Sequence, residues 1–142
     1  MPKAEGKIVA WVSEEAIRAE WLETLPYSGS PQLVTYETDE FSAVCPFSGL
    51  PDLGRLTIQY VPDKALVELK SLKYYIVSYR QVGIYQENAT DRIYRDLWEL
   101  LKAKYLKVVL EYKPRGGFVA RCEKASASPE ALEEILYSAL GA

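Results

Sequence analysis

The chain contains no histidine, and this absence narrows the chemistry that it can perform. Ser-His and Cys-His nucleophile pairs are excluded, as are the usual zinc sites that need imidazole ligands. Any reaction must therefore use cysteine, a carboxylate, lysine, tyrosine or a cofactor. Cysteine is scarce too, since the chain has only Cys45 and Cys122. They lie far apart, and in a reducing cytosol we expect no disulfide between them.

Long apolar runs are also missing, so we expect no membrane-spanning segment. The first residues, 1–7, lack a signal-peptide pattern, which favours a cytoplasmic location. The net charge of −3 does not favour direct binding to nucleic acid. With 142 residues, 49% of them hydrophobic, the chain has enough apolar surface for one globular domain and its core.

Hydrophobic periodicity predicts elements in the order β-β-α-α-β-β, with an extra helix at each end. The strands and helices fall into separate blocks, which predicts an α+β fold with an antiparallel sheet covered by helices on one face. The exposed edges of so small a sheet favour oligomerisation. We expect strands at Leu33–Thr38, Arg55–Val61, Leu66–Leu69, Tyr105–Tyr112 and Phe118–Cys122, and helices at Ser13–Leu25, from Ser71 to Gly83, from Asn88 to Leu101, and from Ser128 to about Leu140.

Cys45 is the first candidate for chemistry. It begins a turn-rich loop between two predicted strands, and Asp52 follows it within the same loop, where reactive groups are commonly placed. A thiol needs a partner that manages its proton, and a carboxyl group is the available partner in a chain without histidine. The alternative is that Cys45 is a small buried apolar residue, the commoner fate of cysteine.

The segment Glu68–Tyr75 is the second candidate. Lys70 and Lys73 flank a predicted helix start, where free backbone N–H groups also favour anions. This arrangement suits the phosphates of a nucleotide cofactor. The alternative is an ordinary amphipathic helix whose lysines are solvated.

Two further candidates follow later in the chain. Glu87 precedes a predicted helix cap, and its carboxylate can accept two N–H groups of a guanine-like edge or simply favour the helix dipole. The turn Pro114–Gly117 could bind a phosphate through Arg115 and through the exposed backbone of its glycines. The alternative is that it is only a hairpin turn, in which the glycines adopt positive φ angles. Cys122 is interpreted as structural.

Three motifs together resemble the 7-cyano-7-deazaguanine reductases, the NADPH-dependent nitrile reductases of queuosine biosynthesis. The resemblance extends from about Tyr36 to Cys122. It implies the tunnelling fold (T-fold), in which such units form a barrel as a high-order homo-oligomer of two stacked rings with sites at subunit interfaces. The motifs are Cys45-Pro46-x-x-Gly49-x-Pro51-Asp52, Glu68-Leu69-Lys70-Ser71-Leu72-Lys73-Tyr74-Tyr75 and Pro114-Arg115-Gly116-Gly117.

The resemblance also implies a mechanism. The Cys45 thiolate would add to the nitrile carbon of 7-cyano-7-deazaguanine to give a thioimide, Asp52 would donate a proton, and two NADPH molecules would complete reduction to the aminomethyl product. No metal is implied. The residues implied to bind substrate are Val67, Glu68, Leu69, Gln86 and Glu87, and those implied to bind NADPH are Lys70, Ser71, Lys73, Arg115 and Gly116.

One departure and three alternatives accompany this prediction. The family usually has Phe-His-Glu where this chain has Tyr85-Gln86-Glu87, and Gln86 cannot shuttle a proton. The alternatives are the related archaeosine amidinotransferase, a zinc-dependent cyclohydrolase of the same fold, and a paralogue without activity.

For the organisation of the chain we expect an N-terminal helical extension at 1–30, a catalytic domain at 31–123 and a C-terminal helix at 124–142.

Overall fold

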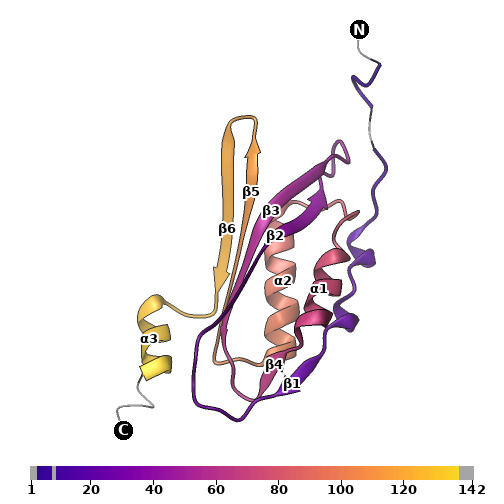
Figure 1. The fold of residues 1–142 in the computed structure, drawn as a ribbon. Coiled ribbons are helices and arrows are strands. Elements are labelled where there is room, and N and C mark those ends of the chain that lie inside the picture. The colour runs from indigo at the N-terminus through magenta and orange to yellow at the C-terminus, as the bar shows by residue number, and fades with distance from the viewer. Residues whose placement is uncertain (1–2, 8, 138–142) are drawn as a thin grey trace.

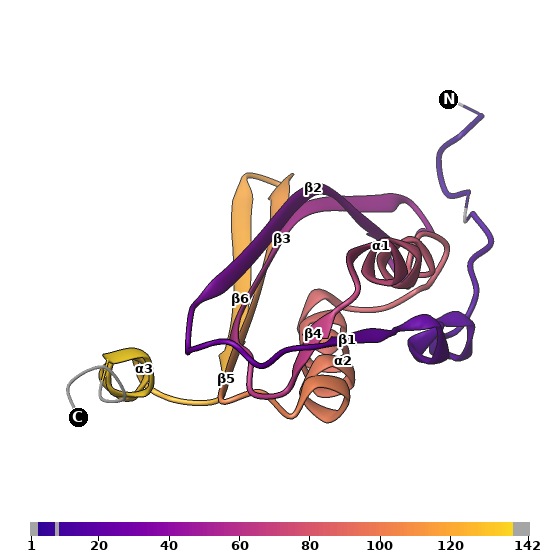
Figure 2. The ribbon, with the colours of Figure 1, turned by 60° about the horizontal axis from the view of Figure 1, so that its bottom comes forward.

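The computed structural model describes residues 3–7 and 9–137. Its centre is a four-stranded antiparallel sheet in the order β2-β3-β5-β6. Helices α1 and α2 both cover one face of this sheet (Figures 1 and 2). The expected α+β architecture is therefore confirmed. The bounds of these elements are β2 Val34–Val44, β3 Pro51–Val61, α1 Leu69–Val77, α2 Gln86–Leu101, β5 Tyr105–Arg115 and β6 Phe118–Ala125.

Alternation along β3 directs one face of the sheet toward the helices. Leu56, Ile58 and Tyr60 alternate along the predicted strand Arg55–Val61, which places them on one face, and all three are buried. They belong to the same core cluster as Tyr75 of α1 and Ile93 of α2. Burying each such side chain contributes on the order of 2 kcal/mol, so the sheet and the two helices depend on one another for stability.

The strand β2 is longer than its sequence pattern predicts. Its register with β3 shifts between Thr38 and Phe41, which marks a bulge. After this irregularity the pairing continues to Val44, opposite Pro51. The bulge interrupts the strict alternation on which the expected end at Thr38 rested.

Helix α1 begins at Leu69 rather than after Ser71. The Glu68 carboxylate accepts hydrogen bonds from the backbone N–H groups of Lys70 and Ser71, at 3.1 and 2.7 Å, and so caps the helix. The helix also ends at Val77, before the expected Gly83. The chain between 78 and 83 turns instead, and a parallel bridge joins Gly83 to Val44 at the end of β2.

Helix α2 begins at Gln86, so Asn88 lies inside the helix instead of capping it. The N-cap residue is Tyr85, whose side chain makes no capping bond. Lys102 in the left-handed conformation ends the helix. The start of α2 is set by the buried Gln86 side chain, described below, and not by local capping chemistry.

The helix expected at Ser13–Leu25 is wrong. This segment forms two 3₁₀ turns, η1 (Glu14–Ala16) and η2 (Ala19–Trp21), and then β1 (Thr24–Pro26), which pairs with β4 (Ala65–Val67). Its apolar residues Ile17 and Leu22 are nevertheless buried. Tertiary packing therefore satisfies the apolar pattern without a helix.

The sheet of a single chain is open, because β2 and β6 each pair with one strand only and form its edges (Figure 1). Gly116 and Gly117 have positive φ angles of 58° and 83° in the β5–β6 hairpin, which confirms the expected turn. Helix α3 (Pro129–Tyr137) follows β6, stands away from the sheet and buries none of its described residues. The expected end near Leu140 lies outside the described residues.

Candidate active site

Cys45 lies in a tight loop that connects β2 to β3. Its N–H donates to the Leu50 carbonyl at 2.9 Å, and its own carbonyl accepts from the Gly49 N–H at 2.8 Å. Gly49 has a positive φ of 72°, which glycine adopts without a steric penalty. The loop therefore has a defined conformation around a partly exposed thiol.

The loop also lowers the pKa of the Cys45 thiol. The main cause is hydrogen bonding from the backbone of Ser48, with further bonds from the Phe47 backbone and the Ser48 hydroxyl. Partial burial and the charge of Asp52 act in the opposite direction. Hydrogen bonds to the charged form increase the thiolate fraction, and the thiolate is the nucleophile.

Asp52 and Arg115 form an ion pair beside this loop. Arg115 Nη1 lies 3.3 Å from Asp52 Oδ1, and Asp52 is only 8% exposed. The guanidinium also lies over the ring of Tyr112, with Cζ 4.8 Å from the ring centroid. A nearly buried carboxylate is thus held by a cation, and both lie near the nucleophile.

Gln86 connects Arg115 to the sheet. Its side-chain nitrogen donates to the carbonyls of Leu110 and Ala120, both at 2.9 Å, and its side-chain oxygen accepts from Arg115 Nη2 at 3.1 Å. Gln86 is 4% exposed. Both of its N–H donors are therefore used within the chain, and neither is available to a ligand.

Glu87 follows Gln86 in the first turn of α2 and is exposed to solvent. Its charge helps burial to raise the pKa of the Cys122 thiol. Glu87, Asp52 and Arg115 also all influence the pKa of the buried Tyr112 hydroxyl, which burial raises. Glu87 therefore has a free carboxylate close to the Asp52–Arg115 pair.

The residues expected to bind NADPH lie mostly elsewhere. Glu68 uses its carboxylate to cap α1, and Glu68, Lys70 and Ser71 line a shallow surface pocket beside Trp21 and Tyr74. The Ser71 hydroxyl is engaged as well, since it donates to the Glu68 carbonyl at 2.7 Å and accepts from the Glu23 N–H at 3.0 Å. The Lys70 ammonium group lies over the Tyr74 ring, with Nζ 5.9 Å from the ring centroid, and is the positive charge in this pocket.

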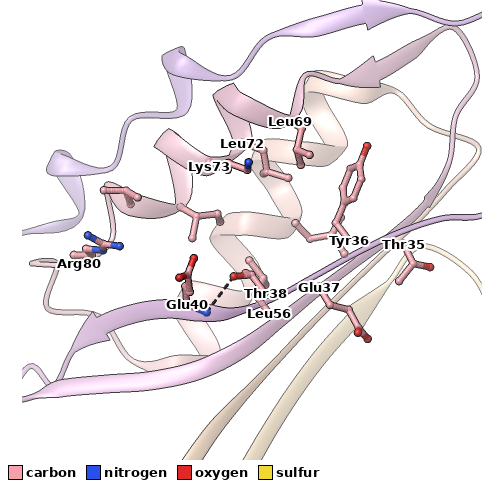
Figure 3. Close-up of a pocket in the computed structure, with 13 residues that line it drawn as sticks. Thr35, Tyr36, Glu37, Thr38, Glu40, Leu56, Leu69, Leu72, Lys73 and Arg80 are labelled. Atoms are coloured by element: carbon pink, nitrogen blue, oxygen red, sulfur yellow. Dashed lines mark hydrogen bonds between the residues drawn. The ribbon is translucent and has the colours of Figure 1, made fainter.

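Lys73 lines a separate groove between α1 and β2, shown in Figure 3. The groove has a volume of about 490 Å³ and combines an apolar floor with Lys73 and Arg80. Leu69 lies at its edge, whereas Val67 is buried and donates its N–H to the Tyr60 hydroxyl at 3.2 Å. The apolar floor consists of Leu56, Ile58, Leu72, Ile76 and Val77.

The candidate residues of one chain therefore form two groups. One group surrounds the Cys45 loop and contains Asp52, Gln86, Glu87 and Arg115, with Gly116 in the adjoining hairpin turn. The other group, Val67–Lys73, begins where β4 precedes α1 (Figure 1). Val67 donates to the hydroxyl of Tyr60, which pairs with Val34 at the start of β2, whereas Cys45 follows the last residue of β2, so the two lie about 30 Å apart. Lys73 lies between these ends, in the groove that Glu40 of β2 also lines.

Three residues of these sites were missed by sequence reasoning. Tyr112 lies under Arg115, Arg80 lines the groove with Lys73, and the Phe47 ring packs edge-on against Tyr85 at 6.4 Å. Arg80 could have been noticed, because it follows Lys73 by two helical turns. The contact of Phe47 with Tyr85 joins segments distant in sequence and leaves no local signal, whereas Tyr112 and Arg115 are neighbours along β5.

Residues 3–7 and 9–137 contain no group of three or more acidic, cysteine or histidine side chains that could hold a metal ion. Within the same ranges, no helix has the length and apolar character that crossing a membrane requires.

The fold and the loop define a class of protein: a T-fold unit in which a partly exposed cysteine of lowered pKa lies beside a nearly buried carboxylate. The structure resembles the crystal structure of the apo archaeosine synthase QueF-Like, with a TM-score of 0.62 over 72% of this chain and 100% of that one. The two sequences are 21% identical, so this likeness concerns the fold alone.

Sequence comparison identifies the family. The model of the QueF-like protein family matches residues 51–131. The NADPH-dependent 7-cyano-7-deazaguanine reductase of Thermotoga petrophila is 54% identical over 127 residues, which cover 89% of this chain and 93% of the relative. The protein of the same name from Caldicellulosiruptor bescii is 53% identical over 116 residues, or 78% of this chain and 88% of the relative. The chain therefore belongs to the QueF-like family.

Proposed function

We propose that this chain reduces the nitrile of 7-cyano-7-deazaguanine to the aminomethyl group with NADPH, in queuosine biosynthesis. The observation that carries the proposal is its 54% identity to a reductase of this name over nearly the full length of both chains. The lowered thiol pKa of Cys45 next to Asp52 provides the chemistry that such a reaction needs.

Cys45 acts as the nucleophile. Its sulfur forms a bond to the nitrile carbon, and the electron pair of one C–N π bond moves to the nitrogen, which takes up a proton. Asp52, nearly buried beside the loop, takes the proton that the Cys45 thiol loses and delivers it to this nitrogen, so the product of this step is a neutral thioimide. The covalent bond holds the substrate carbon in place for reduction.

Glu87 and Gln86 have different tasks. The exposed Glu87 carboxylate accepts the ring and amino N–H groups of the deazaguanine, at the N-terminal turn of α2. Gln86 does not bind the base through its N–H groups, because both are used in the sheet. It holds Arg115, and Arg115 in turn holds Asp52.

The residues of the α1 region fit a dinucleotide phosphate. Lys73 and Arg80 supply positive charge beside an apolar groove, and Lys70 has a free ammonium group nearby. NADPH bound there supplies hydride, and two molecules are consumed for each nitrile. We assign Lys70, Ser71 and Lys73, and the hairpin residues Arg115 and Gly116, to cofactor binding. We assign Val67, Glu68 and Leu69 to substrate binding.

These assignments require more than one copy of the chain. Val67 and Cys45 lie near opposite ends of β2, about 30 Å apart within one chain, which is too far for one substrate to contact both. The free edges of β2 and β6 offer backbone groups for pairing with further copies. We propose a homo-oligomeric barrel of two stacked rings with composite sites. We further propose a cytoplasmic enzyme, because Cys45 must remain a free thiol, and one that does not bind nucleic acid directly.

The test is capture of the covalent intermediate. Incubation with 7-cyano-7-deazaguanine in the absence of NADPH should give an adduct of one substrate per chain by intact-mass spectrometry. Cys45→Ala should abolish the adduct, and Cys122→Ala, which removes the other thiol, should leave it unchanged. Absence of an adduct on the folded wild-type protein would contradict the proposal.

Turnover separates the remaining alternatives. The reductase oxidises NADPH, followed at 340 nm, with the free nitrile base. An archaeosine-type amidinotransferase would form the same adduct but convert only modified tRNA. A paralogue without activity would do neither, and a zinc-dependent cyclohydrolase would contain metal by elemental analysis.

A further inference from the structure

A short N-terminal segment, Val9–Val12, lies against the Cys45 loop. We call these four residues the strap. The Val9 N–H donates to the Ser48 carbonyl at 2.8 Å. The two backbones also touch at the next residue, because a Cβ added to Gly49 would collide with the Val9 carbonyl oxygen. The strap thus runs beside the loop that connects β2 and β3 (Figure 1).

The other end of the strap is attached to the turn before α2. The Val12 N–H donates to the Gln81 carbonyl, and the Val12 carbonyl accepts from the Gly83 N–H, both at 2.8 Å. The indole of Trp11 covers Gly83 so closely that any side chain there would overlap it. Since the Val82 carbonyl accepts from the Val44 N–H at 3.0 Å, this anchor is itself bonded to the end of β2.

Ser48 is therefore held from two sides. Its carbonyl is bound by the strap, and it lies in the turn that Cys45 closes through its N–H to Leu50 and its carbonyl to Gly49. Hydrogen bonding from its backbone is also the main cause that lowers the pKa of the Cys45 thiol. The Ser48 hydroxyl oxygen also accepts from the Leu50 N–H at 3.2 Å, which orients the hydroxyl within the loop. A rotation of this residue would move its donors away from the sulfur.

We propose that the strap is a positioning element for the nucleophile: the Val9 N–H holds Ser48 in the orientation that directs its donors to Cys45. The target of the sulfur rests on the proposed function, but the positioning of the sulfur's donors does not. Val9 and Trp11 touch neither substrate nor cofactor in this scheme and act through the loop.

The test compares Val9→Pro with Val9→Ala. Proline removes the N–H that binds Ser48, whereas alanine keeps it and shortens a side chain that is half exposed. The readout is the pH dependence of alkylation by iodoacetamide, measured at each cysteine by peptide mass mapping without any substrate. Cys122 is the internal reference, because it lies outside the loop.

Val9→Pro should shift the Cys45 profile to higher pH and slow its alkylation at neutral pH about fivefold, the effect of weakening roughly one hydrogen bond to a charged group. Val9→Ala should match the wild type, and the Cys122 profile should not move in either variant. If the pH dependence of Cys45 alkylation were identical in the two variants, the proposal would be wrong, and the strap would only cover the loop.

Trp11→Ala provides a second test, because it loosens the anchor at Gly83 without altering the loop. It should shift the Cys45 profile in the same direction as Val9→Pro, with folding confirmed by circular dichroism. An unchanged Cys45 profile in folded Trp11→Ala would overturn the proposal even if Val9→Pro did not fold. A different result would contradict the proposed function alone: a wild-type protein whose Cys45 has a low pKa but forms no adduct with the nitrile. The proposal about the strap would still hold in that case.

Discussion

Arg115 Nη1 lies 3.3 Å from Asp52 Oδ1, and the same guanidinium donates to Gln86. Asp52, Arg115 and Gln86, which stands where the family usually has histidine, are thus connected by one ion pair and one hydrogen bond. In this arrangement Gln86 supports the site by fixing Arg115 rather than by transferring a proton.

Asp52→Asn should lower kcat by about 100-fold, because the amide keeps the size of the carboxyl group but does not supply the proton. The KM for the nitrile base should change much less. Steady-state kinetics at 340 nm measures both. Asp63→Asn, an exposed residue in the turn after β3, is the control and should behave as wild type. A loss confined to KM would contradict the role of proton donor.

Gln86→Leu should destabilise the fold by about 1–3 kcal/mol, because the carbonyls of Leu110 and Ala120 lose their shared donor. Urea unfolding followed by tryptophan fluorescence measures the change. Asn88→Leu, at an exposed position of the same helix, should have little effect. If Gln86→Leu had normal stability and failed only to bind the base, Gln86 would be a substrate ligand after all.

Glu87→Ala should weaken binding of the deazaguanine base about 10-fold to 100-fold, the range for hydrogen bonds to a charged group. NADPH binding should be nearly unchanged. Isothermal titration of each ligand separates the two effects. Glu99→Ala, exposed near the other end of α2, is the matched control. Equal losses for base and NADPH would refute the assignment of Glu87.

Lys73→Ala should raise the KM for NADPH by about 10-fold with little change for the base, since a phosphate loses a partner that lines the groove. The effect should shrink as ionic strength rises, because salt screens exposed charges. Lys64→Ala, exposed between β3 and β4, removes the same charge outside the groove. The assignment fails if both variants respond alike.

The two thiols should titrate in opposite directions from an ordinary cysteine. Hydrogen bonds from the Ser48 backbone lower the pKa of Cys45, whereas burial and the charge of Glu87 raise that of Cys122. Because only the thiolate reacts, alkylation of Cys45 should level off at a lower pH than that of Cys122. Asp52→Asn should lower the Cys45 pKa further, since it removes a negative charge. If alkylation of Cys45 levelled off at a higher pH than alkylation of Cys122, the pKa shifts that the loop predicts would be contradicted.

Local patterns in the sequence were sufficient for several features of this protein. Alternation in β3 identified the buried face of Leu56, Ile58 and Tyr60, and glycines identified the hairpin turn. Cys45 and Asp52 could be paired because they lie close in sequence, although the structure places Asp52 in β3 and not in the loop. Each of these features depends on neighbours within a few residues, which is the range over which strand and turn geometry act.

Tertiary structure alone decided the rest. The apolar pattern of Ser13–Leu25 predicts a helix, but pairing of β1 with β4 makes part of it a strand. Gln86 became a support of Arg115 because the β5–β6 hairpin brings two carbonyls to the start of α2. The strap reaches Ser48, and Val67 lies far from Cys45, for the same reason. Contacts between distant segments depend on how whole elements pack, and side-chain periodicity records only which face of an element is buried.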